Sequence, residues 1–489
     1  MISSTIERHR LVFNRLLLGV VVGGAVVAGL GGCTTPGTSP GTRPAERPNI
    51  LLLSVDTLRF DHIGANGYSV TPSVTPWIDS LAAGGVTFAQ TASSAPETAP
   101  GVATLVTGLY QDRHGVMYNR AELTQENQTL AERMRIAGYQ TAAFIGNANV
   151  DGGHGFGQGF DRVEVISPGP DTFPSTDDKL ASAFGGYLRD REAKGNWFAW
   201  VHLMDPHGPY NSASAWWSAD LQYASPSTVP ERVLPVSESN FGLGVIPLYQ
   251  KLPGTTGLAD YVQRYDGELR FTDSQIGVVL AMLSKAGQLE NTVVVLVADH
   301  GESLVEHDEF FQHGWFVYDT TVRIPFLISW PGRTLAGARV DAAACGVDVV
   351  PTILDLAGVE ASAEEFDGKS LACALSEGDR CGLATASVRG SVPSLREKGC
   401  FSIGPRANHP FSLRGSQYKM IVTPVGAPRD PRAPKGQRTN DPERVELYDH
   451  VSDPGETQDL ASKRPDLVGA MEQDIARMRA RVRSHGWRW

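Results

Sequence analysis

Five short apolar runs are spread along the chain, and each ends at a polar residue or a glycine. Their hydrophobicity is continuous rather than alternating, which is typical of strands buried on both faces of a parallel sheet. The runs cover residues 50–55, 141–145, 198–204, 292–297 and 326–330.

Helical signals fall between these runs. Thr75-Pro76 predicts the start of a helix, because threonine caps helices and proline is tolerated in the first turn, and Gly84-Gly85 predicts its end. A second helix is expected from about Thr129 to Ala137, where Gly138 ends it. The alternation of strands and helices predicts an α/β fold whose mostly parallel central sheet is flanked by helices.

The pattern changes near residue 380, which predicts a domain boundary. Residues 417–423 and 444–448 have the length and composition of short antiparallel strands. A helical period follows over residues 466–483, with Leu467, Met471, Ile475 and Met478 on one face. We therefore expect a main domain over residues 49–380 and a smaller antiparallel α+β subdomain over residues 381–489.

Residues 211–258 interrupt the main domain. They are rich in serine, proline and aromatic residues. Loops of this length are commonly binding loops or lids.

The first 33 residues resemble a bacterial lipoprotein signal peptide. A start that contains Arg8, Arg10 and Arg15 precedes an apolar run over residues 16–30, and small residues then lead to Cys33. An uncleaved membrane anchor is the alternative, but the run is short for a span of roughly 20 residues. We expect cleavage before Cys33 and acylation of this cysteine. Residues 34–48, rich in Pro, Thr and Gly, would then form a flexible tether to the membrane. This predicts a lipid-anchored protein on the periplasmic side of a bacterial cell envelope.

Composition narrows the class of partner. Of the 489 residues, 41% are hydrophobic and 20% are charged, which is typical of a core-forming globular protein. The net charge of -11 argues against nucleic acid, because phosphate backbones select basic surfaces. It does not exclude a small anionic substrate, since a bound metal ion can reverse the local potential.

Export would place the remaining cysteines in an oxidising compartment. Cys345, Cys373, Cys381 and Cys400 then form an even set with three possible pairings. Cys373 and Cys381 bracket a short polar stretch, so we favour this pair. The spacing of the four cysteines gives little support to a metal site.

Polar residues follow three of the predicted strands. Asp56 follows the first, Asp205-Pro206-His207 the third, and Asp299-His300 the fourth. Ligands of open parallel sheets bind beyond the carboxyl ends of the strands, so these groups are expected at one edge. Each alone is as well explained as a turn former or helix cap. Together they predict a site for one divalent metal ion.

Sequence blocks along nearly the whole mature chain resemble the sulfatase family, in the alkaline phosphatase superfamily. Each block alone is weak evidence, but all occur in family order. They are the opening strand at 48–59, Thr98-Ala99-Pro100 with 105–110 and 113–116, Asp205-Pro206-His207-Gly208-Pro209-Tyr210, Asp299-His300-Gly301-Glu302 with His313-Gly314, and the segments 323–332, 347–352 and 447–454.

The resemblance implies roles for the matching positions. Asp56, Asp299 and His300 would hold one divalent ion, with Mg, Mn, Ca and Zn equally open. Thr98 would be the nucleophile and would also contact the metal. His207 and His313 would contact the anion or protonate the leaving oxygen. Asn147 and His114 are the candidate substrate-binding residues, although His114 is equally well explained as scaffold. His202, inside a predicted strand, is expected to be structural.

The departures from the family pattern bear on the chemistry. Formylglycine sulfatases have Cys or Ser in a C-x-P-x-R motif, whereas here Thr98 takes the first position and Val102 replaces the arginine. Thr57 replaces the second aspartate of the usual pair. Asn147 and Asn149 replace the Lys and His of the G-K-W-H block. The chain is thus similar to the one-metal phosphodiesterases, phosphonate hydrolases and phosphoglycerol transferases of the superfamily.

Three functions follow as hypotheses. The first is a metal-dependent hydrolase of sulfate or phosphate esters, in which Thr98 favours phosphate mono- or diesters. The second is an envelope transferase that passes a phosphoglycerol or phosphoethanolamine unit to an alcohol. The third is a ligand-binding protein on a decayed enzyme scaffold, which Gly101, Val102, Asn147 and Asn149 would suggest.

Overall fold

A computed structural model describes residues 47–167, 175–191, 195–211, 220–223, 232–375, 399–405, 409–425 and 443–484. Residues 47–489 form one compact unit. The predicted lipoprotein signal with Cys33, nearly all of the tether and the predicted boundary at residue 380 lie outside the described residues.

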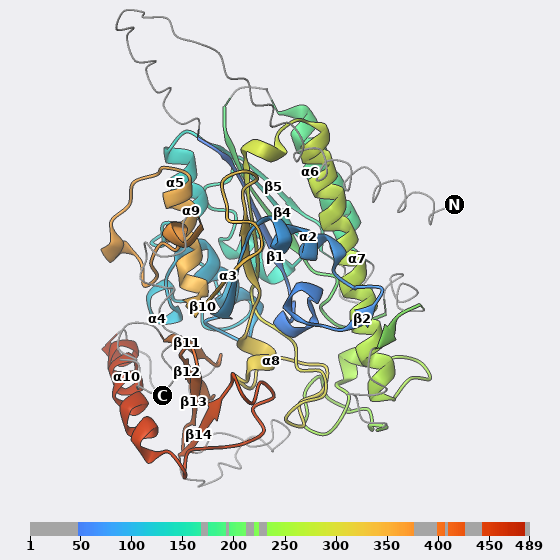
Figure 1. Ribbon diagram of the computed structural model, residues 1–489, viewed down its shortest axis with the longest axis vertical. Helices are drawn as coiled ribbons and strands as arrows, with labels where there is room; N and C mark the ends of the chain where they lie inside the picture. The colour runs from blue at the N-terminus through green and yellow to red at the C-terminus, as the bar shows by residue number, and fades with distance from the viewer. Residues whose placement is uncertain are drawn as a thin grey trace, which may run out of the picture. The chain divides into compact units, whose positions relative to one another are not determined.

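An eight-stranded sheet with the order β10-β3-β9-β8-β1-β6-β4-β5 forms the centre of this unit (Figure 1). All five predicted strands are present. Every residue of β1, β6 and β8 is buried, which explains why their sequences are continuously apolar. The strands are β1 (Asn49–Val55), β3 (Val86–Ala92), β4 (Gln140–Ile145), β5 (Arg162–Val165), β6 (Trp197–Leu203), β8 (Thr292–Ala298), β9 (Phe326–Ser329) and β10 (Ala338–Cys345).

One predicted strand runs in the opposite direction. β9 was expected to be parallel, and this was wrong: it pairs antiparallel with both β8 and β3. The segment between β8 and β9 stays near the edge where β8 ends, so β9 starts at that edge and returns. The other strands pair parallel with one another, which confirms the mostly parallel sheet.

Helices cover both faces of the sheet. In Figure 1, α6 and α7 lie on one side and α3, α5 and α9 on the other. Both predicted helices are confirmed, one with Thr75 at its N-cap and Pro76 in its first turn, the other with a capping box between Thr129 and Glu132. The helices are α2 (Pro76–Gly84), α3 (Thr98–Thr107), α4 (Gln111–His114), α5 (Leu130–Ile136), α6 (Asp177–Asp190), α7 (Leu258–Lys285), α8 (Asp319–Val322), α9 (Val349–Leu356) and α10 (Pro465–Ser484).

A second, antiparallel sheet follows in the C-terminal part. It has the order β11 (Cys400–Ile403), β12 (Phe411–Arg414), β13 (Tyr418–Thr423) and β14 (Arg444–Asp449). The four residues predicted on the apolar face of α10 are all buried beside this sheet. The expected antiparallel α+β subdomain is therefore confirmed. A small sheet of β2 (Val70–Thr71) and β7 (Gln222–Tyr223) includes part of the insertion at residues 211–258.

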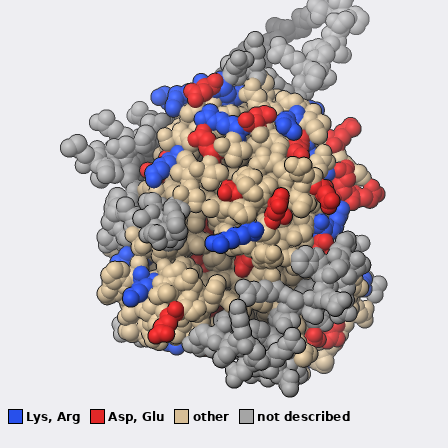
Figure 2. Space-filling model, turned by 180° about the vertical axis from the view of Figure 1, so that it is seen from behind, with Lys and Arg blue, Asp and Glu red and all other residues tan. Residues whose placement is uncertain are grey.

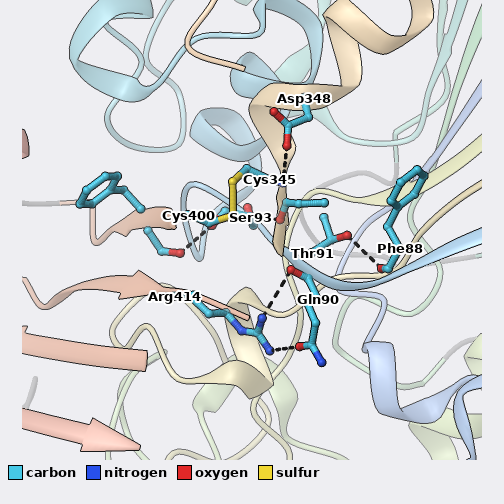
Figure 3. Close-up of a disulfide and its surroundings, with 12 residues drawn as sticks. Phe88, Gln90, Thr91, Ser93, Cys345, Asp348, Cys400 and Arg414 are labelled. Carbon is cyan, nitrogen blue, oxygen red and sulfur yellow. Dashed lines mark hydrogen bonds between the residues drawn. A yellow bond between two sulfur atoms is a disulfide. The ribbon is translucent and has the colours of Figure 1, made fainter. Parts of the chain in front are cut away.

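Two sets of contacts join the antiparallel sheet to the main sheet. A disulfide links Cys345, at the end of β10, to Cys400 in β11 (Figure 3). The buried guanidinium of Arg414 donates to Gln90 of β3 and to Asp319 of α8, and buried Lys419 also binds Asp319. The bond between Cys345 and Cys400 is the one that remains when the favoured pair, Cys373 with Cys381, forms. Cys373 is also disulfide-bonded, and its favoured partner Cys381 lies outside the described residues.

We expect the Cys345–Cys400 bridge to contribute about 2–4 kcal/mol to the free energy of unfolding, because it closes a loop with a sequence separation of 55. Cys345→Ser and Cys400→Ser should each lose this amount in denaturant unfolding. The double variant should lose no more than either single variant. Additive losses would mean that the two cysteines are not bonded to each other.

The surface carries side chains of both charges. On the face shown in Figure 2, the described Lys and Arg side chains are interspersed with Asp and Glu and form no continuous basic area. Within the described ranges, no helix is both long and apolar enough to cross a bilayer.

Candidate active site

Two aspartates meet at the carboxyl edge of the main sheet. Asp56 follows β1 and Asp299 follows β8, and these strands are hydrogen-bonded neighbours in register. His300 comes next in the chain, and its Nε2 lies 3.5 Å from an oxygen of each carboxylate. All three side chains are fully buried. The rule that ligands bind beyond the ends of parallel strands thus located this cluster correctly.

The three side chains fit a divalent metal ion. One ligand atom from each lies within 4.8 Å of the others, and Asp56 Oδ1 and Asp299 Oδ2 are buried without a hydrogen-bond partner. Burial and the adjacent Asp56 raise the pKa of Asp299 well above its usual value, as expected for two carboxylates without a cation. His300 Nδ1 donates to the Gly301 carbonyl, which leaves a lone pair on Nε2.

Thr98 lies beside this cluster, at the first residue of α3. Its hydroxyl is 3.3 Å from Asp56 Oδ2, to which it donates, and 3.3 Å from His300 Nε2. The N-terminus of a helix carries a partial positive charge, which favours an incoming anion. The structure therefore places the predicted nucleophile next to the predicted metal ligands.

Asn119 clamps the start of α3. Its side-chain oxygen accepts from the Ala99 backbone N–H at 2.8 Å, and its own backbone N–H donates to Glu97 at 3.0 Å. These two bonds fix the residues on either side of Thr98. Neither Glu97 nor Asn119 was singled out from the sequence, because nothing in the local pattern relates the two segments.

The main chain of Asp299 is supported from two sides. A Cβ atom added at Gly101 would lie 2.7 Å from the Asp299 carbonyl oxygen, so only glycine allows α3 to pack this closely. Ser93 Oγ hydrogen-bonds the same carbonyl. Ser402 Oγ in turn donates to the Ser93 carbonyl at 2.6 Å, so β11 of the antiparallel sheet supports the site.

Two histidines stand next to His300. The ring centroids of His300 and His313 are 4.4 Å apart, and those of His313 and His207 are 5.1 Å apart. His207 Nδ1 donates to the Gly208 carbonyl at 2.7 Å. His313 Nδ1 lies 3.0 Å from Glu302, which also accepts from Tyr210 at 3.1 Å. Each histidine is therefore held through Nδ1, and its Nε2 is available to a substrate.

Glu302 is a site residue without a predicted role. Burial raises its pKa to about 7, although His207 and His300 act in the opposite direction. The residue stands in the Asp299-His300-Gly301-Glu302 block, but only the three-dimensional contact with His313 reveals its function as an orienting group.

Comparison with known proteins identifies the family. A model of the sulfatase family matches residues 48–359, which is more than half of the chain. The chain belongs to the sulfatase family. It is therefore a sulfatase-like hydrolase that acts on sulfuric or phosphoric ester bonds.

Similar sulfatases cover most of the chain. An ulvan-active sulfatase of Formosa agariphila is 27% identical over 443 residues, which is 85% of this chain and 77% of the relative. A Δ4,5-hexuronate-2-O-sulfatase of Bacteroides thetaiotaomicron is 26% identical, over 85% of this chain and 84% of the relative. Among solved structures, the phosphonate monoester hydrolase of Agrobacterium radiobacter aligns with a TM-score of 0.65 at 20% identity, over 89% of this chain and 96% of its own.

Three further polar residues of this sulfatase lie close to Asp56 or to α3. Asn147 donates to Asp56 Oδ2 at 2.8 Å and so holds a metal ligand, while a contact with substrate stays a prediction. His114 is buried behind α3 with Val116 and Thr104 as partners of its two nitrogens, which is the scaffold role rather than substrate binding. His202 is not remote from the site, since its Nε2 lies 3.7 Å from Asp56.

Proposed function

We propose that this sulfatase-family protein is a one-metal hydrolase of phosphate esters whose nucleophile is the unmodified hydroxyl of Thr98. The observation that carries the proposal is the position of Thr98, within 3.3 Å of both Asp56 and His300 at the N-terminus of α3. A threonine side chain cannot become an aldehyde hydrate, so the formylglycine route is closed to this residue.

Asp56, Asp299 and His300 would hold the metal, with Thr98 beside them. A divalent ion bound there would supply positive charge and acidify the nearby hydroxyl. Its identity among Ca, Mg, Mn and Zn follows from neither the residue types nor their spacing.

The chain's own groups would carry out two displacements. In the first, the Thr98 hydroxyl loses its proton to water and Oγ1 forms a bond to phosphorus, while the bond from phosphorus to the alcohol oxygen breaks and His207 or His313 gives that oxygen a proton. In the second, water attacks the phosphorus of phosphothreonine while the same histidine removes a proton. The bond from phosphorus to Thr98 Oγ1 breaks, phosphate or a phosphate monoester leaves, and Oγ1 takes a proton from water to become a hydroxyl again.

Phosphorus suits this cycle better than sulfur. Water can hydrolyse a phosphothreonine at phosphorus, whereas a sulfated alcohol tends to release sulfate by breaking its own carbon–oxygen bond. A formylglycine hydrate avoids that problem with its second hydroxyl, which Thr98 lacks.

The charges around Thr98 favour a substrate with a single negative charge. Carboxylates, imidazoles and an amide surround it, and no Lys or Arg in the described ranges bonds to the side chains of this group. A doubly charged monoester would gain less compensation there than a phosphodiester. We therefore propose phosphodiesters as the preferred class.

Sulfate esters are the second candidate class, because both relatives from Formosa agariphila and Bacteroides thetaiotaomicron are sulfatases. A decayed binding protein is disfavoured. Asp56, Asp299, His300 and Thr98 lie together with two oriented histidines, and Gly101 is explained by its contact with Asp299.

A matched substrate series tests the proposal. The metal-loaded protein is assayed on bis(p-nitrophenyl) phosphate, p-nitrophenyl phosphate and p-nitrophenyl sulfate, which share one leaving group. We expect the highest kcat/KM for the diester and an unmodified Thr98 in peptide mass spectrometry. A preference for the sulfate ester would refute the phosphate assignment. A product formed with added glycerol would favour the transferase instead.

His207→Ala and His313→Ala should reveal the general acid. Loss of this group is expected to lower kcat by roughly 10²–10⁴-fold for alcohols that leave poorly, and much less for good leaving groups such as nitrophenol. At least one variant should show this dependence across a series of leaving-group pKa values. Equal losses across the series for both variants would mean that the two histidines only bind the anion.

We further propose that Cys33 carries a lipid that holds the protein at the cell envelope. The basic start, the apolar run and Leu30-Gly31-Gly32-Cys33 support this. Cys33→Ser should prevent metabolic labelling with a radioactive fatty acid and should leave the signal uncleaved at this site. Labelling of the variant equal to that of the natural protein would contradict the proposal.

A further inference from the structure

We propose that His202 is a positioning residue for the metal ligand Asp56, and that Ser54 and Trp200 set the orientation of its ring. This inference rests on the metal site described above but not on the identity of the ester.

The sheet itself brings the four side chains together. Ser54 of β1 and His202 of β6 are paired in register, so their side chains are neighbours on one face. Trp200 and Asp56 lie two residues from His202 and Ser54, which places them on the same side by the period of a strand. All four residues are almost completely buried.

The hydrogen bonds determine which ring nitrogen of His202 carries the proton. Trp200 Nε1 donates to Ser54 Oγ at 2.7 Å, and Ser54 Oγ lies 2.8 Å from His202 Nδ1. Ser54 Oγ could also accept from an Nδ1–H, but the bare Nε2 of that tautomer would face the carboxylate of Asp56, so Ser54 donates its proton to His202 Nδ1. In the neutral ring, the proton is then on Nε2.

This N–H faces the carboxylate of Asp56. His202 Nε2 lies 3.7 Å from Asp56 Oδ2, which is an electrostatic contact rather than a hydrogen bond. The same oxygen accepts from Asn147 at 2.8 Å, while Oδ1 has no partner. One carboxylate oxygen is thus held by the protein, and the other is left for the metal.

His202 does not belong to the ligand set itself. Among the described residues, the group of ligand atoms within 4.8 Å of one another comes from Asp56, Asp299 and His300. A nitrogen that carries a proton also has no lone pair to offer. Partners of this kind orient the ligands, and losing one typically lowers metal affinity by about 10–100-fold.

Two substitutions separate positioning from simple packing. His202→Leu keeps most of the volume and removes the N–H, whereas His202→Gln restores an N–H donor at the end of the side chain. The metal-free proteins are titrated with Mn²⁺ alone by calorimetry, and their thermal midpoints are measured without metal. We expect the Leu variant to bind Mn²⁺ about 10–100-fold more weakly and the Gln variant to stay within about fivefold of the natural protein.

The outcomes distinguish the possible errors. Equal Mn²⁺ affinity of the Leu variant and the natural protein would overturn the role of His202, and so would an equal loss in both variants. Normal Mn²⁺ binding without phosphoester hydrolysis would overturn the proposed function and leave this inference intact. Absence of Mn²⁺ binding by the natural protein would overturn the metal site and this inference with it.

A spectroscopic measurement covers the case in which a variant fails to fold. In the natural protein labelled with ¹⁵N-histidine, long-range nitrogen–proton spectra report the tautomer of each ring. We expect the His202 signals to show a bare Nδ1 and a protonated Nε2. Ser54→Ala should shift them by removing the donor to Nδ1. A protonated Nδ1 in the natural protein would overturn the proposed hydrogen bond from Ser54 to His202.

Discussion

Thr98→Ala is expected to lower kcat on the best phosphoester by on the order of 10³-fold or more, because the covalent route is lost. Metal affinity should change far less, since the carboxylates of Asp56 and Asp299 and the imidazole of His300 would provide most of it and the Thr98 hydroxyl would be a weak, neutral ligand. The measurement is kcat at saturating substrate together with a metal titration of the same sample.

Thr98→Ser is the matched control. It keeps a hydroxyl at the start of α3 and loses only a methyl group, so we expect its kcat to lie within about tenfold of the natural protein. An active alanine variant would show that Thr98 is not the nucleophile. A serine variant as inactive as the alanine variant would show that the methyl group, rather than the hydroxyl, matters at this position.

Asp299→Asn should have the second largest effect. It should weaken metal binding and activity, whereas it should stabilise the metal-free protein. Metal affinity is expected to fall by about 100-fold or more, since even an outer partner of a ligand is worth 10–100-fold. Activity at moderate metal concentration should fall in parallel. The metal-free variant, by contrast, should be more stable than the metal-free natural protein.

The gain in stability follows from the repulsion between the two buried carboxylates. The pKa of Asp299 is raised mainly by burial and further by the charge of Asp56. An amide at position 299 has no charged form for burial to disfavour and can donate toward Asp56, which we expect to add about 1–3 kcal/mol to the free energy of unfolding. Denaturant titrations with and without a chelator measure the free energy of unfolding of the metal-free and metal-loaded proteins. A variant less stable than the natural protein under both conditions would contradict this account.

The strands that could be predicted are those buried on both faces. β1, β6 and β8 are central, and apart from Asn49, Ser54, His202 and Thr292 their residues are apolar and form continuous runs. β5 and β10 lie at the sheet edges, where β5 and the first half of β10 alternate between partly buried and exposed residues, and β3 contains Thr87, Gln90 and Thr91. Such mixed segments lack a clear signal from hydrophobicity alone.

The candidate metal ligands could be predicted from the sequence, whereas the residues that orient them could not. Asp56, Asp299 and His300 follow strands, and strand ends converge at one edge, so the sequence could place them together. Asn119, Glu302 and His202 act through contacts with other segments. Ser54 and His202, for example, are separated by 148 positions, and no local pattern reports such a contact.

Asp319 has a consequence for how the whole protein unfolds. It lies on α8, next to the main sheet, yet its bonding partners Arg414 and Lys419 belong to β12 and β13. Burial alone would raise the pKa of Asp319, but these two cations hold it well below its usual value. Separation of the sheets would leave Asp319 without a cation in one part and Arg414 without a carboxylate in the other, while Lys419 would keep only Glu456. The antiparallel sheet is therefore not a detachable module, and we expect both sheets to melt in a single cooperative transition.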